Sequence, residues 1–202
     1  MMKSLSVIGN GKVNKDLSNI IDKSDVVVRF NNLDNYNLNT GTKITIWVLS
    51  SNKILLTRLI ENPKPIVDKA KLNNSIKQEL IFSIPTFFPV KTESQIEQNR
   101  KERDYAVNQF LNHFDLMKHP YSMIEFPINY LFDLQPEKWL SKYQCPSNGY
   151  LITRFFADNP IYSDYEINLV GFSWEGWEGH PWEFEKKYLE EMEHKKLIQI
   201  LK

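Results

Sequence analysis

Short runs of apolar residues alternate with polar, turn-forming segments near both ends of the chain. Close to the N-terminal end, runs at residues 5–8, 25–30 and 43–49 are rich in β-branched side chains and are bounded by glycine and asparagine. This pattern predicts strands buried on both faces, as in a parallel sheet. Apolar positions at helical spacing in residues 13–21 predict a short helix between the first two strands. The order strand, helix, strand predicts a right-handed βαβ unit whose ligand lies beyond the carboxyl ends of the strands.

The last third of the chain returns to the same order of elements. Residues 150–157 predict a helix with Ser147 or Asn148 near its N-cap, and residues 166–172 predict a strand that contains a glycine near its end. Residues 182–201 predict a closing helix, because early glutamates and late lysines suit the helix dipole. We therefore expect an α/β fold, with a Rossmann-like, mostly parallel sheet flanked by helices.

The middle of the chain, residues 52–143, has a different character and contains no glycine. Apolar positions in residues 93–118 predict a long amphipathic helix, and residues 79–84 and 121–126 predict strands. No internal repeat and no segment with the composition of a linker divides the chain. We expect one domain over residues 1–202.

Composition and charge exclude several classes of protein. Hydrophobic residues make up 42% and charged residues 25%, which excludes a disordered or fibrous chain. The 25 lysines and arginines balance 25 aspartates and glutamates, so a dedicated nucleic-acid binder is not expected. The single cysteine, Cys145, excludes an intrachain disulfide. No apolar stretch of about 18 residues and no signal-peptide pattern occurs, so we expect a cytoplasmic protein without a transmembrane segment.

The seven glycines fall in three groups that mark candidate sites. They are Gly9, Gly11 and Gly41, then Gly149, then Gly171, Gly176 and Gly179. The turn at residues 9–11 lacks the third glycine of a dinucleotide-binding pattern, because Asn14 stands there. It is either a plain turn between strand and helix or a turn that holds one phosphate. Residues 146–149 are likewise either a capping motif or a binding site for a carboxylate or phosphate.

The third group leads to the most reactive candidate, His180. It directly precedes Pro181, beside a predicted helix N-terminus, where the dipole favours the neutral ring that a general base needs. Glu183 and Glu185 act in the opposite direction, so the sequence leaves the net shift open. A structural histidine is the alternative. No pair of histidines has the spacing of metal ligands and Cys145 has no partner, so no metal site is expected.

Three stretches, taken in order, resemble the sialyl motifs of the family-29 sialyltransferases. The match to the large motif comprises residues 7–11, 21–31 and 41–43, and the match to the small motif comprises residues 146–149 and 170–172. His180-Pro181-Trp182-Glu183-Phe184-Glu185 resembles the very small motif, a histidine with a glutamate five residues on. The resemblance covers residues 5–50 and 144–190.

The resemblance implies a modified Rossmann-like fold of the GT-A type and an inverting glycosyltransferase. Its donor would be a CMP-activated 2-keto sugar acid, CMP-sialic acid or CMP-Kdo, and its acceptor a glycan hydroxyl. His180 would take the proton of the acceptor hydroxyl, and Glu185 would support the site. The nucleotide-sugar would be bound by residues from both terminal segments, namely Gly9, Asn10, Gly11, Asn31, Ser147, Asn148 and Gly149. No cofactor is implied and no metal is expected, because CMP carries one phosphate and the chain has no Asp-x-Asp motif.

The chain departs from the animal members of that family at several positions. Leu5 stands near the place of their first conserved disulfide cysteine, Cys145 has no partner, and Asn148 stands where threonine is frequent. Together with the missing membrane anchor, this suggests a compact microbial relative that builds capsule or lipopolysaccharide glycans, with peripheral membrane association. Residues 1–50 and 144–202 would bind the donor and carry catalysis, and residues 52–143 would face the acceptor.

Two other functions remain open at the level of sequence. A nucleotide-binding module without catalysis would show the same turns and glycines. A nicotinamide-dependent oxidoreductase is disfavoured by Asn14 in place of the third glycine. The loop tryptophans Trp174 and Trp177 either stack on a sugar or base or pack in the core.

Overall fold

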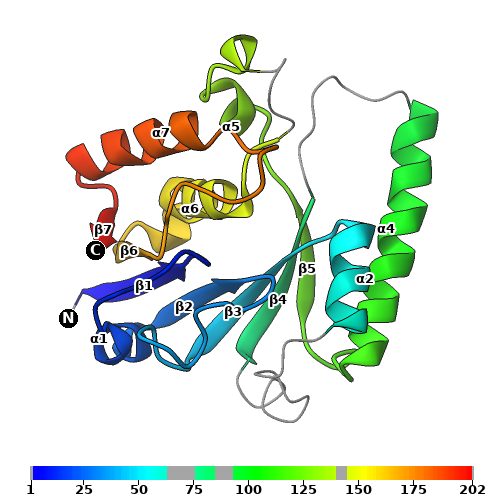
Figure 1. Cartoon of the computed structure of the whole chain (residues 1–202), viewed down its shortest axis with the longest axis horizontal. Coiled ribbons are helices and arrows are strands. Elements are labelled where there is room, and N and C mark those ends of the chain that lie inside the picture. Colours follow the sequence, from blue (N-terminus) through cyan, green and yellow to red (C-terminus); the bar gives the residue numbers. More distant parts are fainter. Residues whose placement is uncertain (1, 63–75, 85–92, 140–144, 202) are drawn as a thin grey trace.

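The computed structural model describes residues 2–62, 76–84, 93–139 and 145–201 (Figure 1). In this part of the chain, a seven-stranded sheet has the order β5-β4-β3-β2-β1-β6-β7, and every pair of neighbours is parallel. The strands are β1 Lys3–Ile8, β2 Val26–Phe30, β3 Ile44–Ser50, β4 Ile76–Ile84, β5 Tyr121–Glu125, β6 Tyr165–Val170 and β7 Gln199–Leu201. The α/β class and the parallel sheet predicted from the sequence are confirmed.

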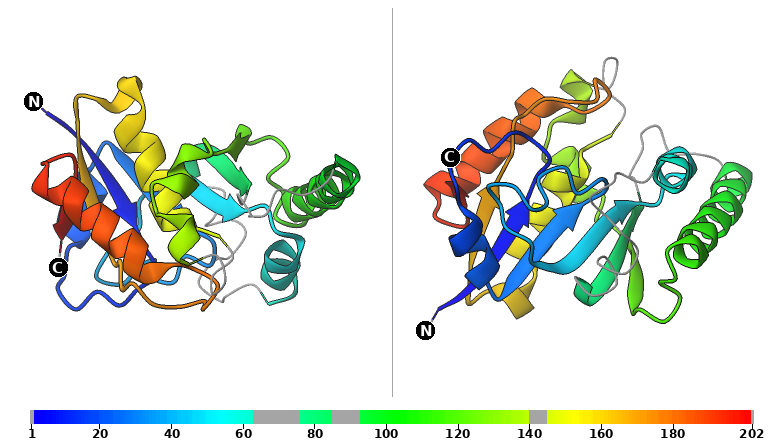
Figure 2. Two further views of the ribbon diagram at one scale, coloured as in Figure 1. Left: turned by 90° about the horizontal axis from the view of Figure 1, so that it is seen from above. Right: turned by 60° about the horizontal axis from the view of Figure 1, so that its bottom comes forward.

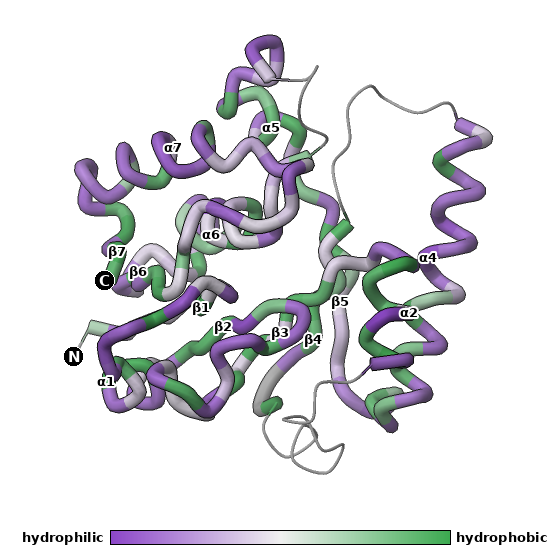
Figure 3. Tube along the Cα trace, in the orientation of Figure 1, coloured by the Kyte–Doolittle hydropathy of each residue, from purple (hydrophilic) through white to green (hydrophobic). Residues whose placement is uncertain are grey.

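Helices cover both faces of the sheet (Figures 1 and 2). They are α1 Ser18–Lys23, α2 Lys53–Glu61, α4 Glu93–His113, α5 Asn129–Phe132, α6 Asn148–Asp158 and α7 Trp182–His194, with short 3-10 turns at Pro136–Lys138 and Pro160–Tyr162. Val28 and Val48 point to the core beneath α5, α6 and α7, while Trp47 and Phe82 point to the core beneath α2 and α4. Hydrophobic residues recur along β2 and β3, and the long helix α4 is largely hydrophilic (Figure 3).

The strand order contains one reversal of direction. The chain moves outward from β1 through β2, β3 and β4 to β5, and then returns to place β6 on the other side of β1. In open α/β sheets, ligands bind in the crevice outside the carboxyl ends of the strands at such a reversal. Here that crevice lies between the end of β1, at Ile8, and the end of β6, at Val170.

The helix predicted for residues 13–21 is shorter and later than expected. Residues 12–17 are not helical, and α1 begins only at Ser18. Asn39 competes with a helix here, because its side-chain amide donates to Val13 O (2.8 Å) and its carbonyl accepts from Leu17 N (2.8 Å). Asp16 accepts from both the backbone and the hydroxyl of Ser18 and starts the helix there. The turn at residues 9–11 therefore does not open a helix, contrary to that part of the sequence interpretation.

The closing helix is also shorter than predicted. Instead of running to residue 201, α7 ends at His194, and Gln199–Leu201 forms the edge strand β7. Lys196 adopts φ 60°, and Lys196 N bonds to Glu193 O (2.8 Å) while Leu197 N bonds to Met192 O (3.0 Å). These two bonds form a Schellman motif, which usually has glycine in the left-handed position. Because lysine stands there, the sequence carries no visible stop signal.

The middle of the chain supplies one side of the sheet and its helices. Strands β4 and β5 extend the sheet, and α2 packs beside α4 (Figure 1). The two predicted strands and the long helix of this segment are therefore confirmed, with α4 ending at His113 rather than at residue 118. Parts of the predicted acceptor-side segment 52–143, namely residues 63–75, 85–92 and 140–143, lie outside the described residues.

No helix in the described part of the chain combines the length and the apolar character that a bilayer crossing requires.

Candidate active site

A cleft of about 870 Å³ opens at the carboxyl ends of the central strands. It is lined by the turns after β1 and β6, the ends of β2 and β3, and the first residues of α2, α6 and α7. Eight of the predicted site residues line it: Gly9, Asn10, Gly11, Asn31, Ser147, Asn148, Gly149 and His180. The structure thus brings together residues from both terminal segments. The ninth, Glu185, lies behind the wall of the cleft.

Glycine is required where the two turns cross at the reversal of strand order. Gly9 N donates to Val170 O (2.8 Å), and Gly11 N donates to Gly171 O (2.9 Å). A Cβ atom on Gly9 would lie 2.4 Å from Gly171 O, and Gly171 itself has φ 70°. Only glycine permits so close a backbone approach without displacement of one chain.

Asn35 holds this turn, although the sequence interpretation missed it. Its side-chain amide donates to Gly9 O (2.7 Å) and to Gly11 O (2.6 Å), and the residue is buried. With both carbonyls bound to Asn35, the turn is fixed at the floor of the cleft. The available signal is the run of asparagines in residues 31–40, a composition that is typical of loops.

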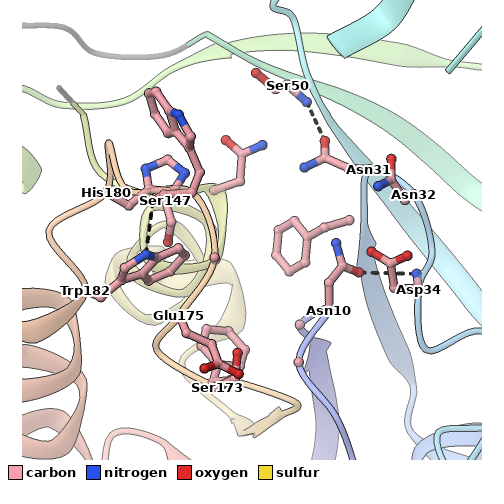
Figure 4. A pocket seen from close by; sticks show the side chains of 18 of the residues that line it. Asn10, Asn31, Asn32, Asp34, Ser50, Ser147, Ser173, Glu175, His180 and Trp182 are labelled. Carbon is pink, nitrogen blue, oxygen red and sulfur yellow. Dashed lines mark hydrogen bonds between the residues drawn. The ribbon is translucent and has the colours of Figure 1, made fainter. Parts of the chain in front are cut away.

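Two asparagines on one side of the cleft are anchored through their oxygens. Asn31 Oδ1 accepts from Ser50 N (3.0 Å), and Asn10 Oδ1 accepts from Asp34 N (3.4 Å). Asn31 has φ 40°, and its backbone carbonyl accepts from the indole of Trp47 (3.1 Å). With both oxygens occupied, the amide nitrogens of Asn10 and Asn31 turn toward the open cleft, where they can donate hydrogen bonds (Figure 4).

The wall formed by the start of α6 depends on Ser147. Its hydroxyl caps the helix by accepting from Tyr150 N (3.2 Å) and donates to Glu185 Oε2 (2.6 Å). Its backbone N–H donates to Glu185 Oε1 (2.6 Å). Ser147 therefore lines the cleft, but its donors are already used within the protein.

Asn148 and Gly149 occupy the first turn of α6. The Asn148 Oδ1 atom accepts from the hydroxyl of Ser83 at the end of β4 (2.7 Å), a contact between residues 65 positions apart. Backbone N–H groups in the first turn of a helix have no partner within the helix, and they favour an anion. This end of α6 can therefore receive a phosphate or carboxylate.

Glu185 is buried in α7 and contacts the wall of the cleft through Ser147. The residue is 1% exposed, and burial raises the pKa of its carboxyl to about 7, although the hydrogen bonds from Ser147 oppose that rise. Its two carboxylate oxygens link the N-terminal turn of α7 to that of α6. Burial thus favours the neutral form of this carboxyl group, and the hydrogen bonds from Ser147 favour its charged form.

His180 lies on the opposite side of the cleft from Asn31 (Figure 4). Its Nδ1 atom is 2.8 Å from Cys145 O, and a carbonyl can only accept, so Nδ1 carries the proton of the neutral ring. The Nε2 atom then holds the lone pair of a general base. Burial lowers the pKa of His180, with the hydrogen bond to Cys145 opposing this in part, which resolves the direction that the sequence left open.

Other polar residues at the cleft were not singled out from the sequence. Lys12 follows the β1 turn, Asn52 caps α2 by accepting from Ile54 N (2.8 Å), and Arg58 lies further along that helix. Lys12 and Arg58 bring positive charge to a site that the sequence interpretation associates with an anionic donor. Lys12 belongs to the predicted donor-binding segment, residues 1–50, and Arg58 belongs to the middle segment, residues 52–143.

Within the described residues, no group of three or more histidine, cysteine, aspartate or glutamate side chains is arranged to hold a metal ion.

The parallel sheet, its covering helices and the cleft at its reversal define a Rossmann-like α/β protein. Among solved structures, this fold matches a mammalian sialyltransferase in complex with Gal-β-1-3GalNAc-ortho-nitrophenol, with a TM-score of 0.53 at 16% identity, over 99% of this chain and 69% of that one. A second mammalian sialyltransferase structure gives a TM-score of 0.52 at 16% identity, with the same coverage. No family profile and no curated protein matches the sequence. The comparison therefore shows a sialyltransferase-type fold.

Proposed function

We propose that the protein is a glycosyltransferase that moves sialic acid from CMP-sialic acid to a hydroxyl of a glycan. The observation that carries the proposal is His180, whose Nδ1 is fixed by Cys145 O so that Nε2 is available as a base in the cleft. The fold shared with mammalian sialyltransferases supports the same reaction class.

The reaction would be a single displacement with inversion at the anomeric carbon. The acceptor oxygen forms a bond to that carbon while the bond to the phosphate oxygen of CMP breaks, and CMP leaves with the bonding electrons. The proton of the acceptor hydroxyl passes to Nε2 of His180. The lowered pKa of His180 supports this role, since the ring is then neutral at physiological pH.

The donor would lie between the β1 turn and the start of α6. The anchored amides of Asn10 and Asn31 would donate to the nucleotide, and the first turn of α6 at Asn148 and Gly149 would receive a negatively charged group. Ser147 would support this wall indirectly, held by Glu185. Glu185 is thus a positioning residue in this proposal.

A Kdo-like donor is the alternative to sialic acid. The proposal further includes independence of metals, a compact microbial type of enzyme, a role in capsule or lipopolysaccharide glycans, a cytoplasmic location and a peripheral association with membranes. Residues 52–143 would contribute to acceptor binding, which is supported by the contact of α2 with the cleft.

Parallel assays with CMP-sialic acid and CMP-Kdo test the proposal directly. The purified protein is incubated with each donor and a mixture of glycans, and both CMP release and labelled product are measured. We expect CMP release and product with CMP-sialic acid. Product with CMP-Kdo alone would show that the donor is CMP-Kdo. If neither donor releases CMP, the proposed enzymatic activity is contradicted.

A thermal-shift series with CMP, CDP, UDP and NAD separates the remaining alternatives. A ligand that binds only the folded state raises the melting temperature. CMP should give the largest rise. Stabilisation by CMP without turnover would favour the nucleotide-binding module, and stabilisation by NAD alone would favour the oxidoreductase.

A further inference from the structure

Three tryptophans between residues 173 and 182 line the cleft, but their surroundings differ. Trp174 packs against Phe172, with ring centroids 5.6 Å apart, and against the apolar core beneath α6 and α7. Trp177 belongs to no apolar core formed by the described residues, and it is 51% exposed. Core packing therefore accounts for Trp174 but not for Trp177, which leaves ligand stacking for Trp177.

The backbone holds Trp177 in place despite its exposure. Its carbonyl accepts two hydrogen bonds, from His180 N (3.1 Å) and from the indole Nε1 of Trp182 (3.1 Å). A Cβ atom on Gly179 would lie 2.4, 2.4 and 2.7 Å from three consecutive carbons of the Trp177 ring. Such similar distances place Gly179 over one face of the ring, so a ligand can reach the indole only at its other face or its edge.

The position of Trp177 decides which substrate it can meet. The rings of Trp177 and His180 lie edge to face, with centroids 4.7 Å apart and an interplanar angle of 88°. Any hydroxyl that reaches His180 therefore belongs to a group lying beside this indole. The amides proposed to hold the nucleotide, on Asn10 and Asn31, lie across the cleft (Figure 4).

A neutral pyranose ring has the chemistry that this surface suits. One face of the ring presents C–H groups, which can cover an indole, while hydroxyls project from the rim toward neighbouring polar groups. The face of an aromatic ring carries negative charge in its quadrupole, so it disfavours an anionic sugar. We infer that Trp177 forms the stacking wall of an acceptor subsite for an uncharged pyranose. This inference rests on the proposed function, which makes the group beside His180 the acceptor.

Binding measurements on three proteins test the subsite: the wild type, Trp177→Ala and Trp177→Phe. Methyl glycosides of galactose, glucose and N-acetylgalactosamine are titrated by ligand-observed NMR, with and without CMP, and CMP affinity is measured separately. Trp177→Ala should weaken the best glycoside about tenfold, and Trp177→Phe should retain most of its affinity. CMP affinity should stay unchanged in both variants. Melting temperatures confirm that both variants fold, as expected for a half-exposed side chain.

The other outcomes contradict either the inference or the proposed function, and they can be told apart. Unchanged glycoside affinity in Trp177→Ala, or no glycoside binding to the wild type, would exclude the subsite. A loss of CMP affinity instead would assign Trp177 to the donor. If glycosides bind through Trp177 but CMP binds no protein of the set, the proposed function fails while the sugar subsite stands.

Discussion

His180 shows how a single hydrogen bond decides the chemistry of a side chain. With Nδ1 donating to Cys145 O, the neutral ring presents only Nε2 as a base, and burial keeps the ring neutral by lowering its pKa. Cys145, which has no disulfide partner in this chain, thus contributes its backbone carbonyl. Its thiol is buried, and burial raises the pKa of that thiol to about 12, so it is inert at neutral pH.

Replacement of His180 should separate catalysis from binding. We expect His180→Ala to lower the transfer rate by about 100-fold or more, which is typical for loss of a general base, while CMP still raises the melting temperature. Initial rates with saturating donor measure the effect. His194→Ala, on the exposed end of α7, is the matched control and should behave as the wild type. Wild-type rates in His180→Ala would place the base elsewhere.

Glu185 should make stability depend on pH in a narrow window. Its pKa rises from 4.5 in the unfolded chain to about 7 in the folded protein, so the folded state binds more protons between these values. Its contribution is complete below pH 4.5 and is lost as pH rises to about 7, by an amount on the order of 3 kcal/mol. Urea unfolding at pH 5 and pH 8 measures it.

Glu185→Gln provides the comparison for that measurement, since the amide does not titrate. The variant should lose less stability than the wild type between pH 5 and pH 8. Equal losses in both proteins would show that other groups cause the dependence.

At the scale of elements, the end of α7 contains a residue that is not ideal for its backbone conformation. Lys196 has φ 60°, where a Cβ atom is unfavourable, and glycine is the usual residue at this place in a Schellman motif. Lys196→Gly should therefore stabilise the protein by about 0.5–1 kcal/mol in urea unfolding. Lys195→Gly is the control, because Lys195 has φ −79° and ψ 0° and glycine there should destabilise. Destabilisation by Lys196→Gly would contradict the assignment.

The elements that the sequence predicted best are those with a strong pattern of their own. The predicted strands at residues 25–30 and 166–172 correspond to β2, Val26–Phe30, and β6, Tyr165–Val170, because runs of β-branched and apolar side chains suit buried strands. The late start of α1 and the early end of α7 depend on contacts from elsewhere, from Asn39 in one case and from a lysine in a left-handed conformation in the other. Neither helix end is marked by a pattern in the neighbouring sequence.

In the site, too, residues marked by their neighbours in sequence were predicted, whereas residues that act through contacts far along the chain were not. His180 and the turns that flank it were predicted because glycines and a helix start mark them in the sequence. The roles of Asn35 and Ser83 were not predicted, because Asn35 reaches back 24 to 26 residues to the β1 turn and Ser83 meets Asn148 across 65 residues. Such contacts become visible only when the sheet order is known.

At the scale of the molecule, the proposed reaction should not need a divalent metal. The CMP leaving group carries one phosphate, which the start of α6 and the donors on Asn10 and Asn31 can accommodate, rather than a diphosphate that a metal ion would bridge. Transfer should therefore continue at an unchanged rate in excess EDTA. A full loss of activity, restored by added Mg²⁺ or Mn²⁺, would contradict this prediction.

The position of β1 between β2 and β6 has a consequence for how the chain folds during synthesis. One edge of β1 can pair early, because β2 follows within about twenty residues of sequence. The other edge cannot pair until β6, which begins at Tyr165, has been synthesised. Until then, a nascent chain on the ribosome exposes the unpaired edge of β1, which carries Leu5 and Val7. An open, apolar edge of this kind is a template for association with other chains. Chaperone dependence should therefore concentrate on the interval before β6 emerges from the ribosome.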